Sequence, residues 1–258
     1  MVLDLESGAV VFVGDGKGAD ALKPFWKRLR PSGAKIEAVA MDMSVAYYGA
    51  VLTHLPKAKI VFDRFHVVKL FNERLSELRR ALYREATDMM HKKVLKGTRW
   101  LLLKNPENLD EEKDEKRRLN EALKLNEPLA TAYYLKDDLR RFWDQPGKRF
   151  ATIFLDGWIR RAEASGIKAL QQMAKTLAAH RSGLLAYYDV MISSGPMEGT
   201  NNKIKTMKRQ AYGFRDIEFF KLKILAIHVI PSKASEPVLS ATGEPLASDM
   251  TVLPQQAR

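Results

Sequence analysis

The segment SGPMEGTNNKIKTMKR, residues 194–209, carries one carboxylate, Glu198, among amides and cations. We expect a helix with Gly195 as its N-cap and Pro196 as its first residue, which makes Glu198 the third helical residue. The unpaired amides and the helix dipole favour a negative charge at that end. Glu198 is therefore the best candidate for a reactive centre. A glutamate that only stabilises the helix N-terminus is an equally good interpretation of this segment taken alone.

The predicted helix has a polar and a less polar face. Counting by three and four from Glu198 groups the side chains on each face. The polar face, a candidate DNA-binding surface, contains Asn201, Asn202, Lys205, Lys208 and Arg209. The less polar face, which can pack on a core, contains Thr200, Ile204, Met207 and Ala211.

A second carboxylate ends an apolar run, IEAVAMDMS at residues 36–44. The run has the pattern of a buried strand, so Asp42 is expected at the carboxyl end of that strand. Ligands and catalytic groups gather at this edge of open α/β sheets. Asp42 could instead cap the following helix, a role that Ser44 could serve equally well. We favour a functional role for Asp42.

A third polar group follows a β-branched strand in KIVFDRFHVVK, residues 59–69. Asp63 comes directly after the strand, and His66 lies in the first turn of the next predicted helix. Asp63 could simply cap that helix. For His66, a structural and a catalytic role are equally well supported.

Together and in this order, these segments resemble the transposases of bacterial insertion sequences, specifically the ISL-three family of the DDE class. The resemblance extends from about Leu3 to about His228. It rests on MDMS at residues 41–44, FDRFHVVK at residues 62–69, and the Glu198 segment with the AYGFRD that follows it at residues 211–216.

The resemblance implies a ribonuclease-H-fold enzyme in which three carboxylates bind two divalent metal ions, Mg²⁺ or Mn²⁺. Asp42 would be the second carboxylate and Glu198 the third. Asp63 and His66 match the Asp-x-x-His signature that many such transposases place between those two. Two metal ions held by carboxylate oxygens suit phosphodiester hydrolysis and strand transfer, because they neutralise charge that grows on the phosphate oxygens.

The first catalytic aspartate implied by the resemblance has no counterpart in the opening segment, MVLDLESGAVVFVGDG. This segment predicts only the second and third strands of the core. Asp4, beside a hairpin turn, and Asp15, in a glycine-bearing loop, have the pattern of turn residues. We therefore interpret the chain as N-terminally truncated and inactive alone.

Composition favours a polyanionic partner. The chain has 43 Lys and Arg against 31 Asp and Glu, a formal charge of +12, which raises affinity for nucleic acid. It has no cysteine, no run long enough to span a membrane and no signal-peptide pattern, so we expect a soluble cytoplasmic protein without a membrane partner. The partners implied are DNA, as transposon ends and target, and a second copy or a parental transposase.

The predicted fold class is α/β, a ribonuclease-H-like mixed sheet that lacks its first strand and carries a large α-helical insertion. We divide the chain into the N-terminal part of the core at residues 1–66, the insertion at 67–190, the C-terminal part of the core at 191–230, and a disordered tail at 231–258. In the insertion, helices are expected at about residues 109–124, 129–143, 149–164 and 168–188, after a long amphipathic helix with Val68, Phe71, Leu75, Leu78 and Leu82 on one face.

Two features of the insertion could contact DNA. Its first arm is basic, with Arg79, Arg80, Arg84, Lys92, Lys93 and Lys96, although such charges are usually a solvated helix face. Its aromatic residues could stack on bases, but at helical spacing we favour a place in the core for Trp143, Trp158, Tyr133, Tyr134, Tyr187 and Tyr188. The function classes that remain are a DDE transposase catalytic domain and a remnant that binds DNA or a transposase without chemistry.

Overall fold

The computed structural model describes residues 1–16 and 18–228, which are mostly helical with four short strands. The chain forms two compact units. Among the described residues, one unit contains residues 14–199, and the other contains residues 1–13 and 200–228. The predicted tail from residue 231 lies outside the described residues. No described helix is both long enough and apolar enough to cross a membrane.

The smaller unit begins with the predicted hairpin. Strands β1 (Val2–Leu3) and β2 (Val10–Phe12) pair antiparallel, and helix α12 (Ile217–Leu225) packs against β2. The Asp4 carboxylate accepts hydrogen bonds from the Ser7 hydroxyl and backbone amide, and Gly8 has a φ of 72°, a conformation that glycine adopts without strain. Asp4 is thus a turn residue, as its sequence context predicts.

The larger unit contains a parallel pair of strands, β3 (Ala38–Met41) and β4 (Lys59–Phe62). Helix α2 (Val45–His54) connects them, as a parallel crossover requires. The described strands form two separate two-stranded sheets, β1 with β2 and β3 with β4. The single mixed sheet of a ribonuclease-H-like core therefore stays a prediction. Before β3 come the 3₁₀-helix η1 (Ala19–Leu22) and helix α1 (Lys23–Ser32).

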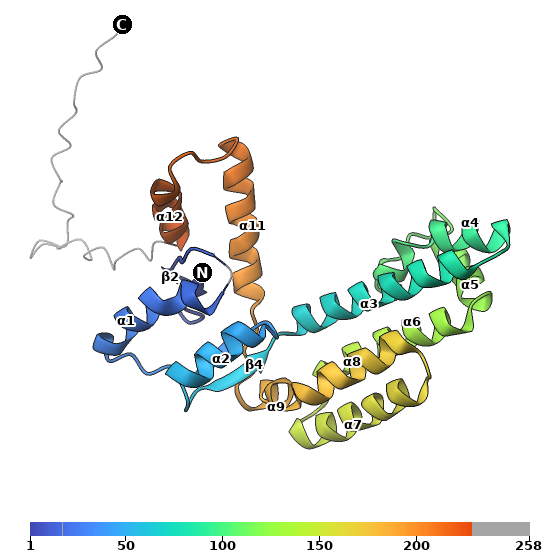
Figure 1. Cartoon of the computed structure of the whole chain (residues 1–258), viewed down its shortest axis with the longest axis horizontal. Helices are drawn as coiled ribbons and strands as arrows, with labels where there is room; N and C mark the ends of the chain where they lie inside the picture. The colour runs from blue at the N-terminus through green and yellow to red at the C-terminus, as the bar shows by residue number, and fades with distance from the viewer. Residues whose placement is uncertain (17, 229–258) are drawn as a thin grey trace, which may run out of the picture. The chain divides into compact units, whose positions relative to one another are not determined.

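The long helix α3 (Arg64–Glu85) follows β4 directly and packs against α6 (Glu127–Arg140) and α8 (Lys168–Ala179), as Figure 1 shows. Its inward side chains are Val67, Phe71 and Leu75, each 1% exposed or less. The predicted stripe began one residue later, at Val68, which is half-buried. The remaining helices of this part are α4 (Met89–Gly97), η2 (Leu101–Leu103), η3 (Pro106–Asn108), α5 (Glu115–Lys124), η4 (Arg141–Asp144) and α7 (Lys148–Ala164).

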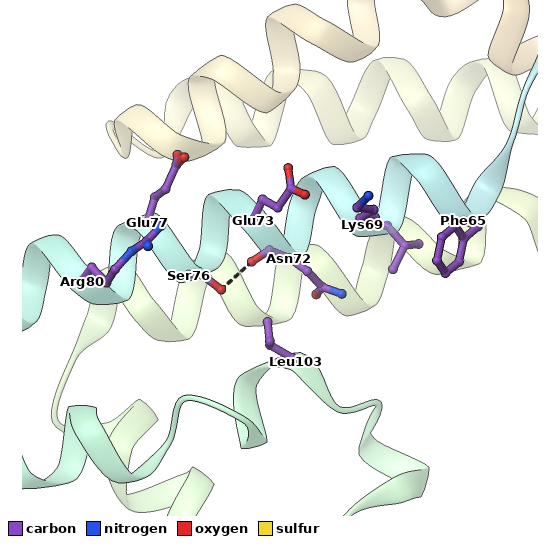
Figure 2. A pocket seen from close by; sticks show the side chains of 9 residues that line it. Phe65, Lys69, Asn72, Glu73, Ser76, Glu77, Arg80 and Leu103 are labelled. Carbon is purple, nitrogen blue, oxygen red and sulfur yellow. Dashed lines mark hydrogen bonds between the residues drawn. The ribbon is translucent and has the colours of Figure 1, made fainter. Parts of the chain in front are cut away.

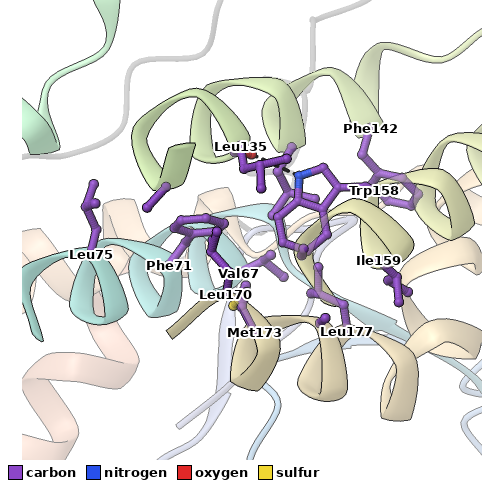
Figure 3. Packing of buried hydrophobic residues seen from close by; sticks show 14 of the residues in the cluster. Val67, Phe71, Leu75, Leu135, Phe142, Trp158, Ile159, Leu170, Met173 and Leu177 are labelled. Atoms are coloured by element: carbon purple, nitrogen blue, oxygen red, sulfur yellow. Dashed lines mark hydrogen bonds between the residues drawn. The ribbon is translucent and has the colours of Figure 1, made fainter. Parts of the chain in front are cut away.

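Trp158 lies at the centre of the helical core (Figure 3). Its side chain is fully buried, its ring meets Phe71 edge to face, and its indole N–H donates to the Leu135 carbonyl at 2.9 Å. Trp143 and Tyr133 are also buried, which confirms the prediction that these aromatic residues belong to the core. Tyr134 is an exception, since it is 60% exposed.

The helix predicted at residues 168–188 is three shorter ones, with the first break at His180. Helix α8 is followed by α9 (Arg181–Leu185) and α10 (Tyr187–Val190). The break lets α9 pack against β4, where Gly183 lies so close to Phe62 that a Cβ atom on Gly183 would be 2.4 Å from the Phe62 ring. Only glycine fits this contact without a shift of the ring or the backbone.

Candidate active site

The carboxyl ends of β3 and β4 place two of the predicted carboxylates on neighbouring strands. Met41 pairs with Phe62, and the Asp63 backbone N–H donates to the Met41 carbonyl at 3.2 Å. Asp42 directly follows the last residue of β3, and Asp63 directly follows the last residue of the neighbouring strand β4. Parallel pairing therefore produces the arrangement that the sequence predicts, with both residues at the sheet edge where α/β proteins bind ligands.

Asp42 is half-buried and shapes the turn that leads into α2. One of its carboxylate oxygens accepts the Ser44 backbone N–H at 3.1 Å. Ser44 occupies the N-cap position of α2, and its side chain makes no capping hydrogen bond. Asp42 is therefore a hydrogen-bond acceptor in the turn, two residues before the N-cap of α2, and its half-buried side chain keeps access to solvent.

Asp63 occupies the N-cap position of α3, but its carboxylate does not cap that helix. The side chain is buried, with Asp63 4% exposed, and it accepts the Ser194 hydroxyl at 2.6 Å and the Ser194 backbone N–H at 3.4 Å. A buried carboxylate needs hydrogen-bond donors, because removing its charge from water is otherwise costly. Ser194 supplies them to the end of β4.

Ser194 directly precedes the helix that carries Glu198. Helix α11 runs over Gly195–Gln210, and the Glu198 backbone N–H donates to the Ser194 carbonyl at 3.0 Å. This start puts Ser194, and not Gly195, in the N-cap position, so the predicted register is wrong by one residue. The physical reason is that the bonds to Asp63 fix Ser194 where its carbonyl accepts the first helical hydrogen bond. Glu198 remains in the first turn and is half-buried.

A chain of contacts thus connects the three motifs. Asp42 and Asp63 end adjacent strands, Asp63 binds Ser194, and Glu198 lies one helical turn beyond Ser194. Sequence reasoning missed the role of Ser194. The available signal was a small hydroxyl residue just before a Gly-Pro helix start, a type that often stabilises helix N-termini. That signal does not reveal a partner 131 positions away.

His66 lies in the first turn of α3, as predicted, and is half-buried. Its imidazole meets the Phe65 ring edge to face, with 5.6 Å between the ring centres. A half-buried ring in the first turn of α3 is compatible with either of the two roles considered for His66.

The rest of α11 has the two faces that were predicted. The side chains expected on the polar face are all exposed, and Thr200 is buried, with Ile204 and Met207 half-buried. Ala211 is exposed, because the helix ends at Gln210, before that residue. The exposed polar set is Asn201, Asn202, Lys205, Lys208 and Arg209.

The carboxylates suit a divalent cation by their chemistry, since Mg²⁺ and Mn²⁺ prefer hard oxygen ligands. Asp42 and Glu198 are the residues that would hold such an ion, because the Asp63 carboxylate is occupied by Ser194. Within residues 1–16 and 18–228, no group of three or more His, Asp or Glu side chains is arranged to hold a metal.

A surface groove of about 420 Å³ follows α3, but it is a separate feature from the carboxylates (Figure 2). Its charged lining is mixed in sign, with Glu73 and Glu77 between Lys69 and Arg80 along the helix. The Ser76 hydroxyl in its wall donates to the Asn72 carbonyl at 2.8 Å, a bond within the helix. None of the three motif carboxylates lines this groove, so it does not extend the candidate active site.

Comparison with known proteins agrees with the family resemblance of the sequence. The model of the ISL3 family of DDE transposases, described as transposase, matches residues 1–224. The chain is 38% identical over 229 residues to the transposase for insertion sequence element IS1001 of Bordetella parapertussis, covering 88% of this chain and 56% of that protein. It is 29% identical over 268 residues to the transposase for insertion sequence element IS1557 of Mycobacterium tuberculosis, covering 93% of this chain and 60% of that protein.

A family match over most of the chain defines the class: the protein belongs to the ISL3 family of DDE transposases. The chain spans somewhat more than half the length of the curated relatives it matches. No solved structure matches it.

Proposed function

We propose that this chain carries part of the catalytic domain of a DDE transposase and acts in DNA transposition, by metal-dependent phosphodiester hydrolysis and strand transfer. The observation that carries the proposal is the hydrogen bond from Ser194 to Asp63. It connects the residue before α11, the helix that carries Glu198, to the end of β4, whose neighbouring strand β3 directly precedes Asp42. In this proposal the two sheets belong to one ribonuclease-H-like core, and residues 67–190 are an insertion in it.

Each motif residue has a distinct role in this proposal. Asp42 and Glu198 hold Mg²⁺ or Mn²⁺, and the bound ions supply charge neutralisation at the scissile phosphate. Asp63 is a positioning residue, because its carboxylate already binds Ser194. His66 lies three residues after Asp63, in the first turn of α3, and belongs to the same motif. The exposed amides and cations of α11, from Asn201 to Arg209, bind the phosphates of the transposon ends and target.

Metal-dependent nicking of DNA tests the proposal. The full chain is incubated with labelled duplexes that carry the transposon ends, with Mg²⁺, Mn²⁺ or EDTA. We expect nicking that requires the metal and falls at least a hundredfold in Glu198→Gln and in Asp42→Asn, because an amide cannot replace a carboxylate ligand. Glu127→Gln, an exposed glutamate in the first turn of α6, is the matched control. Nicking that survives both Asp42→Asn and Glu198→Gln would contradict the assignment of the ligands.

A second candidate function is DNA or transposase binding without chemistry. It is favoured by the exposed basic residues of α11, which need no metal to bind a polyanion. End-specific binding in EDTA, together with no nicking in either metal, would support this candidate over the first. Dimer formation measured by sedimentation would further identify a second copy as a partner.

A further inference from the structure

The end of α3 and the following helix α4 carry a dense group of cations. Residues 79–100 contain seven Lys and Arg and only two acidic residues, Glu85 and Asp88. Asp88 is engaged as the N-cap of α4, where its carboxylate accepts the backbone N–H groups of Met90 and His91. None of these seven cations forms an ion pair with a carboxylate in the part of the chain that the structure describes.

The fold holds several of these like charges together. The Arg79 guanidinium donates to the Leu95 carbonyl at 3.0 Å and so fastens α3 to α4. Burial lowers the pKa of Arg79, and the nearby charges of Arg99 and Arg80 lower it further. Like charges that are held close together repel, so this arrangement costs stability in the isolated protein. A polyanionic ligand would relieve that repulsion.

A large aromatic side chain stands exposed in the same place. Trp100, in the turn after α4, is 64% exposed, and the Arg99 guanidinium lies 4.5 Å from the centre of its ring. By contrast, Trp158 and Trp143 are buried. An exposed indole with a cation beside its ring is a combination with which proteins bind unpaired nucleotides, because bases stack on the ring while cations hold phosphates.

We propose that this surface, the basic tip, is a second DNA-binding site that holds backbone phosphates and stacks one unpaired base on Trp100. The basic tip is defined as Arg80, Arg84, Lys93, Lys96, Arg99 and Trp100, all of them exposed. The proposal rests on the proposed function for the identity of the ligand. It adds a site on the insertion, distinct from α11, and a preference for DNA with an unpaired strand.

An anionic lipid surface is the main competing ligand, because Met89 and Met90 are also exposed. Helices that lie on membranes separate an apolar from a charged face. In α4 the exposed methionines and Lys93 and Lys96 share the outer surface, while Leu95 is packed inward at 4% exposed. This interleaving of cations and apolar groups favours nucleic acid over a membrane.

The cation part of the proposal is tested by DNA affinity in EDTA. Fluorescence anisotropy of the full-length Glu198→Gln chain is measured with a labelled duplex that carries a single-stranded overhang, over a series of salt concentrations. We expect Lys93→Ala with Lys96→Ala to weaken binding about tenfold and to reduce the salt slope by roughly 2, because each lysine contacts one phosphate. Lys168→Ala with Lys175→Ala on α8 removes the same charge elsewhere and should leave the affinity nearly unchanged.

The stacking part has its own variant. Trp100→Ala should weaken binding to the overhang duplex about tenfold while changing affinity for a fully paired duplex less than twofold. The control is Tyr134→Ala, which removes another exposed aromatic residue from the same unit. Equal losses on both DNAs would overturn the stacking of an unpaired base.

Two results would overturn the proposal as a whole. One is an equal loss of affinity in the Lys93/Lys96 and Lys168/Lys175 variants, which would mean that only net charge matters. The other is tighter binding of phosphatidylserine vesicles than of DNA, lost in the Lys93/Lys96 variant. Because no step in these measurements needs metal or catalysis, they can succeed even if the chain shows no nicking, and they can fail even if it does.

Discussion

The Ser194 hydroxyl donates to the buried Asp63 carboxylate at 2.6 Å, across 131 positions of the sequence. This bond satisfies the one charged side chain that is buried at the carboxyl end of β4, and it fixes the start of α11. The position of Glu198 therefore depends on a hydrogen bond to a distant part of the sequence.

Removing the Ser194 hydroxyl should destabilise the larger unit. We expect Ser194→Ala to lower the free energy of unfolding by about 1.5–3 kcal/mol, because a buried carboxylate loses its shortest hydrogen bond. Chemical denaturation measures this, and hydrogen exchange at the Glu198 amide should speed up, since its acceptor is the Ser194 carbonyl.

The neighbouring serine provides the control for Ser194. Ser193 is exposed, and its hydroxyl oxygen only accepts the Gly195 backbone N–H. Ser193→Ala should therefore cost less than about 1 kcal/mol. Ser194→Thr, which keeps the hydroxyl, should recover part of the loss. Equal effects of the two alanine variants would refute the special role of Ser194.

A methyl group at Gly183 should be poorly tolerated. A Cβ atom there would lie 2.4 Å from Phe62 Cδ2 and Cε2, so Gly183→Ala should destabilise the protein by about 1–3 kcal/mol. Gly157→Ala, at a helical glycine on α7 with open space around it, should be neutral or slightly stabilising. In a double-mutant cycle, Phe62→Leu should reduce the cost of Gly183→Ala; an additive result would show that the clash is not with that ring.

Lys136 gives the stability a specific pH dependence. It is buried, its ammonium donates to the Leu102 and Lys104 carbonyls, and desolvation lowers its pKa from 10.5 to about 8. Above pH 8 the folded state loses this proton, while the unfolded state keeps it up to pH 10.5. The unfolded state then binds more protons, so stability should rise between pH 8 and 10, by about 2–3 kcal/mol.

Lys136→Met should remove that rise, and Lys124→Met, at an exposed position on α5, should not. Denaturant titrations at pH 8, 9 and 10 measure the difference. The window ends near pH 10 because burial raises the pKa of Tyr133 to about 12. Above pH 10 the folded Tyr133 stays protonated while the unfolded one ionises, which lowers stability. The same slope in Lys136→Met and the unchanged protein would refute the assignment to Lys136.

Trp158 should be the most sensitive tryptophan of the helical core. Trp158→Ala should cost about 3–5 kcal/mol, because it removes a fully buried ring. Trp158→Phe should cost less, although it leaves the Leu135 carbonyl without its indole donor. Thermal and chemical unfolding measure both variants. Trp100→Ala, at an exposed position, should change stability by less than about 0.5 kcal/mol.

Local pattern predicted the order and type of most elements. The apolar run ending at Asp42 and the β-branched run ending at Asp63 are strands, and each is followed by the predicted helix. These signals are local, since they depend on side-chain periodicity along a few residues. The same locality explains why Glu198 was correctly placed in a first helical turn.

What the sequence did not reveal depends on distant contacts. The break at His180 follows from the packing of α9 on β4. The helix predicted from residue 109 begins only at Glu115, because Asp114 has a left-handed backbone conformation with a φ of 53°. No periodicity encodes such events. The Ser194 bond to Asp63 is missed for the same reason, because a serine before a helix has many possible partners.

The contact of Gly183 with Phe62 has a consequence for how the chain acquires its structure. Phe62 leaves the ribosome about 120 residues before the glycine that covers it. During synthesis, Phe62 on β4 therefore lacks its contact with α9 until the helices between them have formed. Long-range contacts of this kind form slowly. Anything that delays α9 should leave a nascent apolar strand available to chaperones.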